Sequence, residues 1–258
     1  MSAPDGLRVT WWGHATASVD LAGVRVLTDP LLVGRLAHLR RHTPTPAPAA
    51  READLVLVSH LHADHLHLPS LARVDAAAPV VVPRGAGPLV RGPGAPRREV
   101  HEVDPGDVLE VAGCVVRVLE AHHDGRRLPW SRRRGPALGF RVDRAGRSFW
   151  FPGDTGPGPD FAAAGPVDLA LVPVGGWGPS LGPEHLDPAQ AADAVAAALA
   201  AAAVPVHWGT FWPTGLERVA PGVHHRLFVT PGERFVAALG DRARGLLLTP
   251  GETRAVRA

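Results

Sequence analysis

Four side chains of metal-ligand type stand within six residues of this 258-residue chain and constrain it more than any other feature. They are His60, His62, Asp64 and His65. The segment follows Leu55–Val58, a continuous apolar run typical of a strand buried on both faces. Four such side chains cannot all face one way on a strand or a helix, so the peptide must turn sharply as it leaves the strand. Imidazoles suit divalent zinc, and a carboxylate adds a hard oxygen ligand for a second cation. An exposed histidine-rich loop is the alternative, and we expect His67 to be a bystander.

Further residues of the same chemistry follow other predicted strands. Asp154 stands in the sequence FPGDTG, and His207 follows a Val-Pro-Val run. Taken alone, Asp154 could be an ordinary turn aspartate, and His207 could be a core histidine beside Trp208. His122 and His123 are adjacent, and successive strand residues point to opposite faces. Only one of these two histidines is therefore expected to be a ligand.

The order of apolar runs predicts an α/β fold, a four-layer αββα sandwich with helices on both outer faces of a β-sandwich. We expect residues 1–258 to form a single domain. Asp187-Pro188 is a good N-cap and N1 pair for a helix that we expect to run through Ala203. A second helix is expected at Glu233–Leu239, and Pro69–Val74 could open another. Expected strands are Leu7–Trp12, Ala17–Leu21, Val24–Leu27, Leu55–Val58, Val80–Val82, Val108–Val111, Val115–Leu119, Ala137–Val142, Ser148–Phe151, Leu169–Val172, Val204–Val206 and Leu246–Leu248.

Composition excludes several classes of protein. A hydrophobic content of 45% is that of a soluble globular protein, and the net charge of +2 does not favour a nucleic-acid partner. The single cysteine, Cys114, rules out an intramolecular disulfide and a site of several thiolates; we expect it to be buried in the core. No signal peptide or membrane span is visible. We expect a cytoplasmic protein without stable membrane association, and homo-oligomers are possible.

The sequence HLHADH resembles the HxHxDH signature of the metallo-β-lactamase superfamily. Further segments are similar to the branch that contains ascorbate-6-phosphate lactonase and N-acyl phosphatidylethanolamine phospholipase D. These segments are WWGHAT (11–16), LTDP (27–30), GDTG (153–156), EHLDP (184–188) and HWGTF (207–211). The resemblance covers most of the chain.

The resemblance implies two metal ions. His60 and His62 would bind one ion together with a later histidine, and Asp64 and His65 would bind the other together with His207, while Asp154 bridges the pair. The family commonly has a small residue two positions before the third histidine, which favours His123 over His122, because Ala121 then takes that place. Two ions about 3.5–4 Å apart would share a bridging hydroxide that attacks the substrate. Zinc is the expected metal because iron-dependent members usually carry glutamate at the position of His62; manganese is possible.

The candidate catalytic residues are Asp64, which also belongs to the ligand set, and His185. The latter follows a Gly/Pro-rich loop and could stabilise a phosphate oxygen or protonate a leaving group, or simply neighbour a helix cap. Asp29 is interpreted as a carboxylate that orients a metal-binding histidine or as a structural turn residue. For His14 we favour a structural role or a role in supporting the ligands.

The predicted function is zinc-dependent hydrolysis of a small anionic ester, lactone or phosphodiester. The arginine-rich segment Arg126–Arg134 could face such a substrate or be a solvated loop. One alternative is a nucleic-acid-processing nuclease, although nucleic acid is not the expected partner. The other is a non-catalytic metal-binding scaffold. The loop Thr43–Ala50 is expected to be a flap over the site or a plain surface connection.

Overall fold

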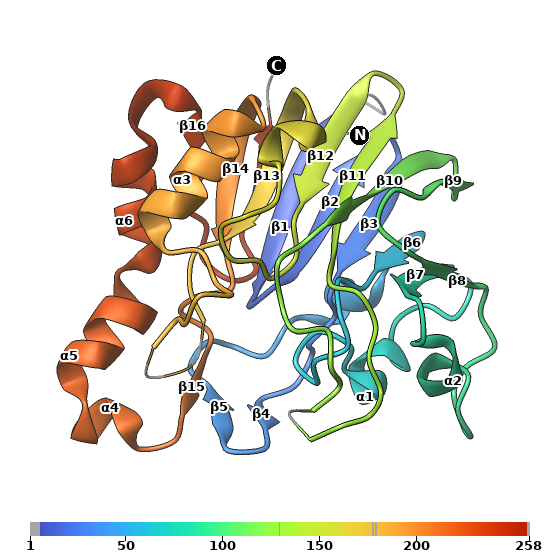
Figure 1. The fold of residues 1–258 in the computed structure, drawn as a ribbon. Coiled ribbons are helices and arrows are strands. Elements are labelled where there is room, and N and C mark those ends of the chain that lie inside the picture. The colour runs from blue at the N-terminus through green and yellow to red at the C-terminus, as the bar shows by residue number, and fades with distance from the viewer. Residues whose placement is uncertain (1–5, 129, 177, 179, 257–258) are drawn as a thin grey trace.

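The computed structural model describes residues 6–256 apart from 129, 177 and 179. Most of its strands form two seven-stranded sheets that lie face to face (Figure 1). The first sheet has the strand order β17 (Thr253–Val256), β1 (Leu7–Gly13), β2 (Thr16–Leu21), β3 (Val24–Thr28), β6 (Leu55–Leu57), β7 (Val80–Pro83), β8 (Val100–Val103). The second sheet has the order β16 (Arg244–Gly245), β14 (Ala200–Val206), β13 (Val167–Pro173), β12 (Arg147–Phe151), β11 (Leu138–Arg144), β10 (Cys114–Glu120), β9 (Val108–Val111).

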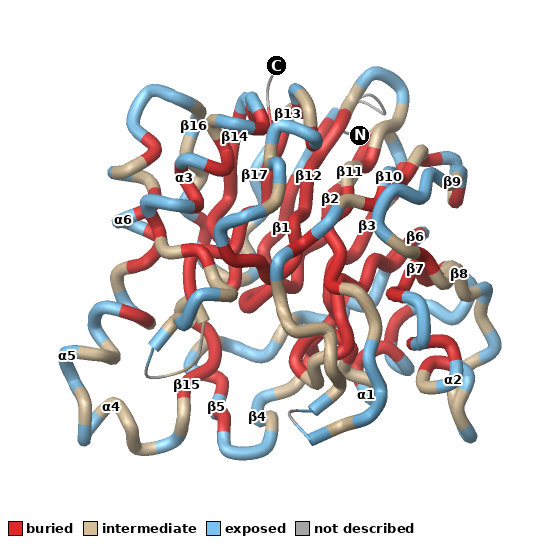
Figure 2. Tube along the Cα trace, in the orientation of Figure 1, coloured by how far each residue is buried: buried red, intermediate tan, exposed pale blue. Residues whose placement is uncertain are grey.

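The main core fills the space between the two sheets. Strand alternation sends every second side chain inward, so Val9 and Trp11 of β1 share one cluster with Phe140 of β11 and Phe149 of β12. Cys114 lies in this cluster and is 1% exposed, which confirms the expectation of a buried thiol. The buried segments converge between the sheets in Figure 2.

Helices cover both outer faces, which confirms the predicted four layers. On the first sheet the helix layer is thin, because α1 (Leu68–Leu71) and α2 (Gly87–Val90) have four residues each. On the second sheet α3 (Pro188–Ala197) and α6 (Pro231–Leu239) pack against a separate apolar cluster. The remaining helical segments are η1 (Pro48–Arg51), η2 (Phe161–Ala164), α4 (Leu216–Val219), α5 (Pro221–His224), the π-helix η3 (His225–Val229) and η4 (Gly240–Arg242).

The alanine-rich segment departs from the prediction. The expected helix from Asp187 to Ala203 ends at Ala197, and Leu199 takes φ +50° before β14 begins. Alanine favours helices, but β14 pairs in parallel with β13 over its length, from Ala200 opposite Val167. The tertiary pairing therefore overrides local propensity. The expected strand Leu246–Leu248 is also absent, since the chain there pairs with β14 only over β16 and the backbone bond from Leu246 N to Ala203 O.

A small third sheet is formed by β15 (Phe211–Pro213), β5 (Leu39–Arg41) and β4 (Arg35–Leu36). Arg41 anchors this hairpin, because its buried guanidinium donates to the carbonyls of Trp12, Leu31 and Val33. Burial lowers its pKa to about 10. Strands β4, β5, β8, β15, β16 and β17 were not expected from the sequence.

The parallel strands place the chemistry at one edge. The strands β12, β13 and β14 run parallel, and so do β3, β6 and β7. Carboxyl ends of parallel strands meet at the same edge of a sheet. The loops after β3, β6, β12 and β14 carry Asp29, residues 59–65, Asp154 and His207 respectively, so segments far apart in sequence meet there.

Candidate metal centre

The loop after β6 folds back on itself and turns its side chains inward. The backbone N–H groups of His65 and Leu66 both donate to His62 O, at 3.1 and 2.9 Å. Arg127 stabilises the outer side of this turn, since its Nη1 donates to Leu61 O and Leu66 O at 2.7 Å each. Burial lowers the pKa of Arg127. This arginine therefore supports the loop through its carbonyls.

Three imidazoles form the first cluster. His62 Nδ1 lies 2.9 Å from His60 Nε2 and 3.2 Å from His123 Nε2. A zinc ion with Zn–N bonds of about 2.0–2.1 Å places its tetrahedral ligand nitrogens about 3.3 Å apart. The three nitrogens thus have nearly the spacing of the ligands of one ion. His123 Nδ1 contacts Glu184 O at 3.0 Å and His60 Nδ1 contacts Ser59 Oγ at 3.0 Å, so each ring keeps its other nitrogen for the cluster.

The neighbouring histidine points elsewhere. His122 is exposed, and its Nδ1 lies 2.8 Å from the carbonyl oxygen of Pro157. The structure brings His123 into the cluster and leaves His122 outside it, as strand alternation past β10 requires. His67 also lies outside the clusters; it accepts the Ser70 N–H as the N-cap of α1.

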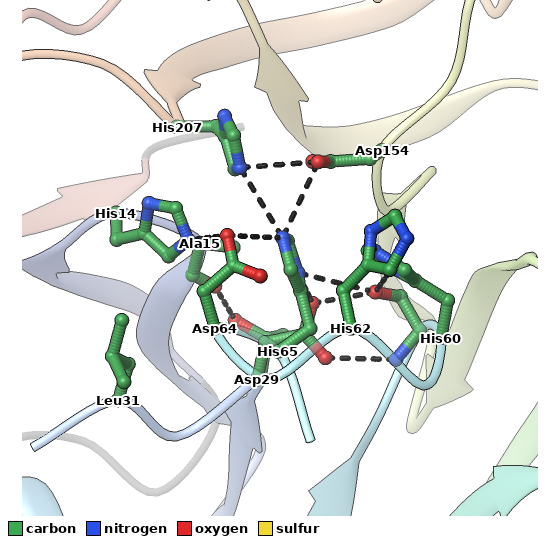
Figure 3. A network of polar contacts seen from close by, with 12 residues as sticks. His14, Ala15, Asp29, Leu31, His60, His62, Asp64, His65, Asp154 and His207 are labelled. Atoms are coloured by element: carbon green, nitrogen blue, oxygen red, sulfur yellow. Dashed lines mark hydrogen bonds and ion pairs between the residues drawn. The ribbon is translucent and has the colours of Figure 1, made fainter. Parts of the chain in front are cut away.

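The second cluster joins three segments of the chain (Figure 3). His65 Nε2 lies 3.2 Å from His207 Nε2, 3.3 Å from Asp154 Oδ2 and 3.6 Å from Asp64 Oδ2. His207 Nε2 lies 3.1 Å from the same Asp154 oxygen. All four residues are buried. His207 Nδ1 contacts the carbonyl of Gly175 at 3.0 Å, which turns Nε2 toward the cluster.

Asp154 lies between the two clusters. Its carboxylate shares one group of possible ligand atoms with His60 and His65, and another with His123 and His185. Its Oδ1 is buried without a hydrogen-bond partner. Buried polar atoms are nearly always paired, so a buried carboxylate oxygen without a hydrogen-bond partner, among imidazole nitrogens, fits a cation-binding site. The donor set of imidazoles and carboxylates is one that zinc accepts.

The carboxylates and imidazoles of the second cluster shift one another's pKa values. Burial alone would raise the pKa of Asp154, but the imidazoles of His207 and His65 lower it well below its usual range. Burial alone would lower the pKa of His65, yet the carboxylates of Asp154, Asp64 and Asp29 raise it well above 6.5. The carboxylates thus favour a positive charge in this cluster, where a divalent cation would bind.

Asp29 supports the second cluster from below. It is fully buried and accepts from His65 Nδ1 at 2.7 Å, from Ser59 N at 2.7 Å and from Ser59 Oγ at 2.6 Å. It also takes φ +33°. Asp29 thus contacts the ring of His65 and also shapes the turn after β3; that His65 binds a metal stays a prediction.

His185 lies at the edge of the centre. It is half-buried, and its Nδ1 lies 3.8 Å from Asp154 Oδ2 with no hydrogen-bond partner. Burial lowers its pKa to about 4. Asp187 is the N-cap of α3, as predicted, and it also forms a capping box with Gln190.

A cleft of about 560 Å³ opens onto the clusters. Its floor includes His62, Asp64, His123, Asp154 and His185, and its apolar wall is made by Leu36, Ala37, Leu39, Leu128 and Trp130. None of residues 43–50 lines this cleft, so the structure favours the interpretation of that loop as a surface connection over a flap, and the hairpin β4–β5 contributes to the wall instead. Neither this wall nor the contacts of Ser59 and Glu184 could be predicted from the sequence, because residues in very short strands and loops form no repeating pattern.

Of the described arginines in the segment Arg126–Arg134, only Arg127 lines the cleft, which favours a solvated loop over a segment that faces the substrate. Arg126 pairs with Asp124 at 2.6 Å, and Arg132, Arg133 and Arg134 are exposed. The Nη1 atom of Arg127 already donates to the loop after β6.

No helix in the described part of the chain is long and apolar enough to cross a membrane.

Comparison with known proteins shows which family this chain is similar to. The family described as beta-lactamase superfamily domain matches residues 24–208. The chain is 31% identical to N-acyl-phosphatidylethanolamine-hydrolyzing phospholipase D 1 of Caenorhabditis elegans, over 80% of this chain and 65% of that protein. It is 31% identical to a protein named metal-dependent hydrolase from Methanopyrus kandleri, over 96% of this chain and 99% of that one.

A solved structure supports the fold. That of Igni18, a metallo hydrolase from Ignicoccus hospitalis, has a TM-score of 0.71 at 18% identity, covering 98% of this chain and 99% of that one. The chain spans 64% of the length of several of its curated relatives. The matched family and the Methanopyrus kandleri relative, which is covered almost completely, together show that the chain belongs to the metallo-β-lactamase superfamily.

Proposed function

We propose that the chain is a two-zinc hydrolase that cleaves an ester, lactone or phosphodiester bond in a small anionic substrate. The observation that carries the proposal is the pair of ligand clusters joined by Asp154, whose Oδ1 is buried without a partner. His60, His62 and His123 would hold one ion. Asp64, His65 and His207 would hold the other, with Asp154 shared. Two such ions, when bound, lower the pKa of water toward neutrality and polarise the bond under attack.

His185 is proposed to contact the substrate. Its half-buried ring faces the cleft beside Asp154, and the lowered pKa leaves it neutral at pH 7. A neutral imidazole donates one hydrogen bond and accepts another. His185 can therefore hydrogen-bond a substrate oxygen. It can also accept a proton from the attacking water and then pass that proton to the leaving group as charge develops there.

The apolar wall refines the substrate class. Leu36 and Leu39 of the hairpin, together with Leu128 and Trp130, line the same cleft as the ligand residues. Trp130 is 80% exposed, so an apolar group of the substrate would cover it. We propose that the substrate carries an apolar portion on this wall and presents its anionic group to the metal centre. The name of one relative fits such a substrate, since it is an N-acyl-phosphatidylethanolamine-hydrolyzing phospholipase D.

The test is a panel of carboxylic esters, lactones and phosphodiesters assayed side by side with zinc-loaded protein. Turnover of at least one class is expected. His185→Ala should lower kcat by about 10²–10⁴-fold, and His122→Ala, a matched change at an exposed histidine, should leave it unchanged. Two bound ions with no turnover on the panel would favour the metal-binding scaffold, and salt-dependent RNA binding would favour the nuclease.

A series of substrates with acyl chains of increasing length tests whether the apolar wall binds the substrate. In a series of linear acyl esters, each added methylene that lies on one apolar wall gains about 0.4 kcal/mol, half of full burial, or about twofold in kcat/KM. Trp130→Ala should flatten this dependence. Val108→Ala, at an exposed position on β9, should preserve it. A wild type that is indifferent to chain length would contradict the assignment of the wall.

A further inference from the structure

His14 is buried beside the second cluster although the ligand set does not need it. It follows β1 and takes φ +54°, a conformation that L residues rarely adopt. Its backbone is held on both sides: N donates to Thr210 Oγ1 at 2.8 Å, and O accepts from Trp11 Nε1 and from His207 N at 2.9 Å each. The strained backbone of His14 is therefore fixed to the segment that carries His207.

The imidazole of His14 packs among the ligand candidates. Its ring centroid lies 4.2 Å from that of His207 and 5.1 Å from that of His65, and Phe211 contacts it edge-on at 5.7 Å. Its Nε2 lies 3.1 Å from Asp64 Oδ2, and a dashed line marks this contact in Figure 3. The side chain thus approaches the metal centre through the carboxylate of Asp64.

Two roles are open to a histidine in this place. The Nε2 atom lies within 4.8 Å of the ligand-type atoms of Asp64, His65 and His207, so His14 could itself be a ligand. Hydrogen bonding separates the two roles. An ionised carboxylate only accepts hydrogen bonds, so in the contact with Asp64 the proton must be on Nε2. A ring nitrogen that carries a proton has no lone pair for a cation.

His65 provides the contrast. Its Nδ1 contacts the carboxylate of Asp29 at 2.7 Å, and its other nitrogen faces the cluster. His207 is held in the same way, since its Nδ1 contacts the Gly175 carbonyl at 3.0 Å.

Among the described hydrogen bonds, the ring of His14 has only the one from Nε2 to Asp64 Oδ2, so no acceptor at Nδ1 draws the proton away from the nitrogen that faces the cluster. We propose that His14 is a positioning residue whose Nε2–H holds the Asp64 carboxylate toward the second ion. This inference rests on the two-ion site of the proposed function.

The effect should be selective. Partners that orient metal ligands typically contribute about 10–100-fold to metal affinity. His14 contacts Asp64, whereas the imidazoles of the first cluster are oriented by Ser59 and by the Glu184 carbonyl. Loss of the His14 donor is therefore expected to weaken the second ion and leave the first unchanged.

The experiment measures zinc binding at each site in wild type and in three variants. His14→Phe keeps a ring but removes the donor, and His14→Gln restores an amide N–H toward Asp64. His122→Phe is the control, because His122 is exposed and outside the clusters. A chelator-competition titration gives the affinities, and anomalous diffraction at the zinc edge gives the occupancy of each site.

The expected result is a second-site affinity about 10–100-fold weaker in His14→Phe, with the first site retained and most of the loss recovered in His14→Gln. Unchanged affinities in His14→Phe would overturn the inference. Complete loss of the second ion in both variants, as in His207→Ala, would overturn it in favour of a ligand role. Equal weakening of both sites would show a folding effect and would also overturn it.

The same data separate this inference from the proposed function. Two ions in wild type without turnover on the ester panel would refute the hydrolase while the His14 comparison still stands. Two ions with unchanged affinities in His14→Phe would refute only the role of His14. A wild type that holds no second ion would refute both.

Discussion

Replacing Asp29 by asparagine tests how the fold supports the second cluster. Asp29 Oδ2 accepts from His65 Nδ1 at 2.7 Å and from Ser59 Oγ at 2.6 Å, while Oδ1 accepts from Ser59 N. In Asp29→Asn one of these oxygens becomes an NH₂ group. If Oδ1 keeps the Ser59 N–H, the new amide donor faces the nitrogen of His65 that must carry a proton when Nε2 binds a metal.

The magnitude follows from that lost bond. A hydrogen bond to a charged group contributes about 1.5–3 kcal/mol, and Asp29 is fully buried, so solvent cannot replace it. The second zinc ion should therefore bind about 10–140-fold more weakly, since about 1.4 kcal/mol is a factor of ten. The first ion should be affected less, because Asp29 contacts none of its three histidines directly and reaches His60 only through Ser59 Oγ.

The assay is a chelator-competition titration of zinc, together with thermal unfolding in the presence of EDTA. Asp193→Asn is the control, since this carboxylate lies exposed on α3 and pairs with Arg242; the change is expected to stay within about 0.5 kcal/mol. Wild-type affinity for both ions in Asp29→Asn would refute the reasoning that this carboxylate orients His65.

Three further predictions concern the support of the loop after β6, the start of α3 and the protons of the metal-ligand candidates. Arg127→Met removes two donors to loop carbonyls at 2.7 Å, so the free energy of unfolding should fall by about 2–4 kcal/mol; denaturant unfolding with no loss would refute the role of Arg127 as a loop support. Asp187→Ala removes the capping box of α3 and should cost about 1 kcal/mol, measured in the same way, and an unchanged midpoint would contradict it. Zinc loading at pH 7 should release protons, because the pKa values of His65 and His207 are raised in the metal-free protein while metal ligands must be neutral. Zinc affinity should accordingly rise with pH until both raised pKa values are passed, and calorimetry in buffers of different ionisation enthalpy that detects no proton release would contradict this.

The ends of the buried strands could be predicted from the sequence. Leu55–Val58 predicted β6 as a buried strand, and the ligand-type residues that follow it required a sharp turn, which the structure shows. The strand at Val108–Val111 was predicted with its observed bounds. Apolar runs bounded by polar or glycine residues are a local signal, so these elements did not depend on distant contacts.

Other features depended on contacts that no local pattern carries. Ala200–Ala203 has helical propensity, and only its pairing with β13 makes it a strand. His123 was preferred through a family rule, whereas its place in the cluster follows from the geometry at the end of β10. The apolar wall brings Leu39 and Trp130, which are far apart in sequence, to one cleft. The tertiary fold alone creates that surface.

The most direct test of the account is the number and position of zinc ions in the protein after chelation and reloading. The account predicts two ions per chain by elemental analysis. Anomalous diffraction should place one ion among His60, His62 and His123 and the other among Asp64, His65 and His207, with Asp154 contacting both. Well under two ions per chain, or ions bound away from these residues, would contradict it.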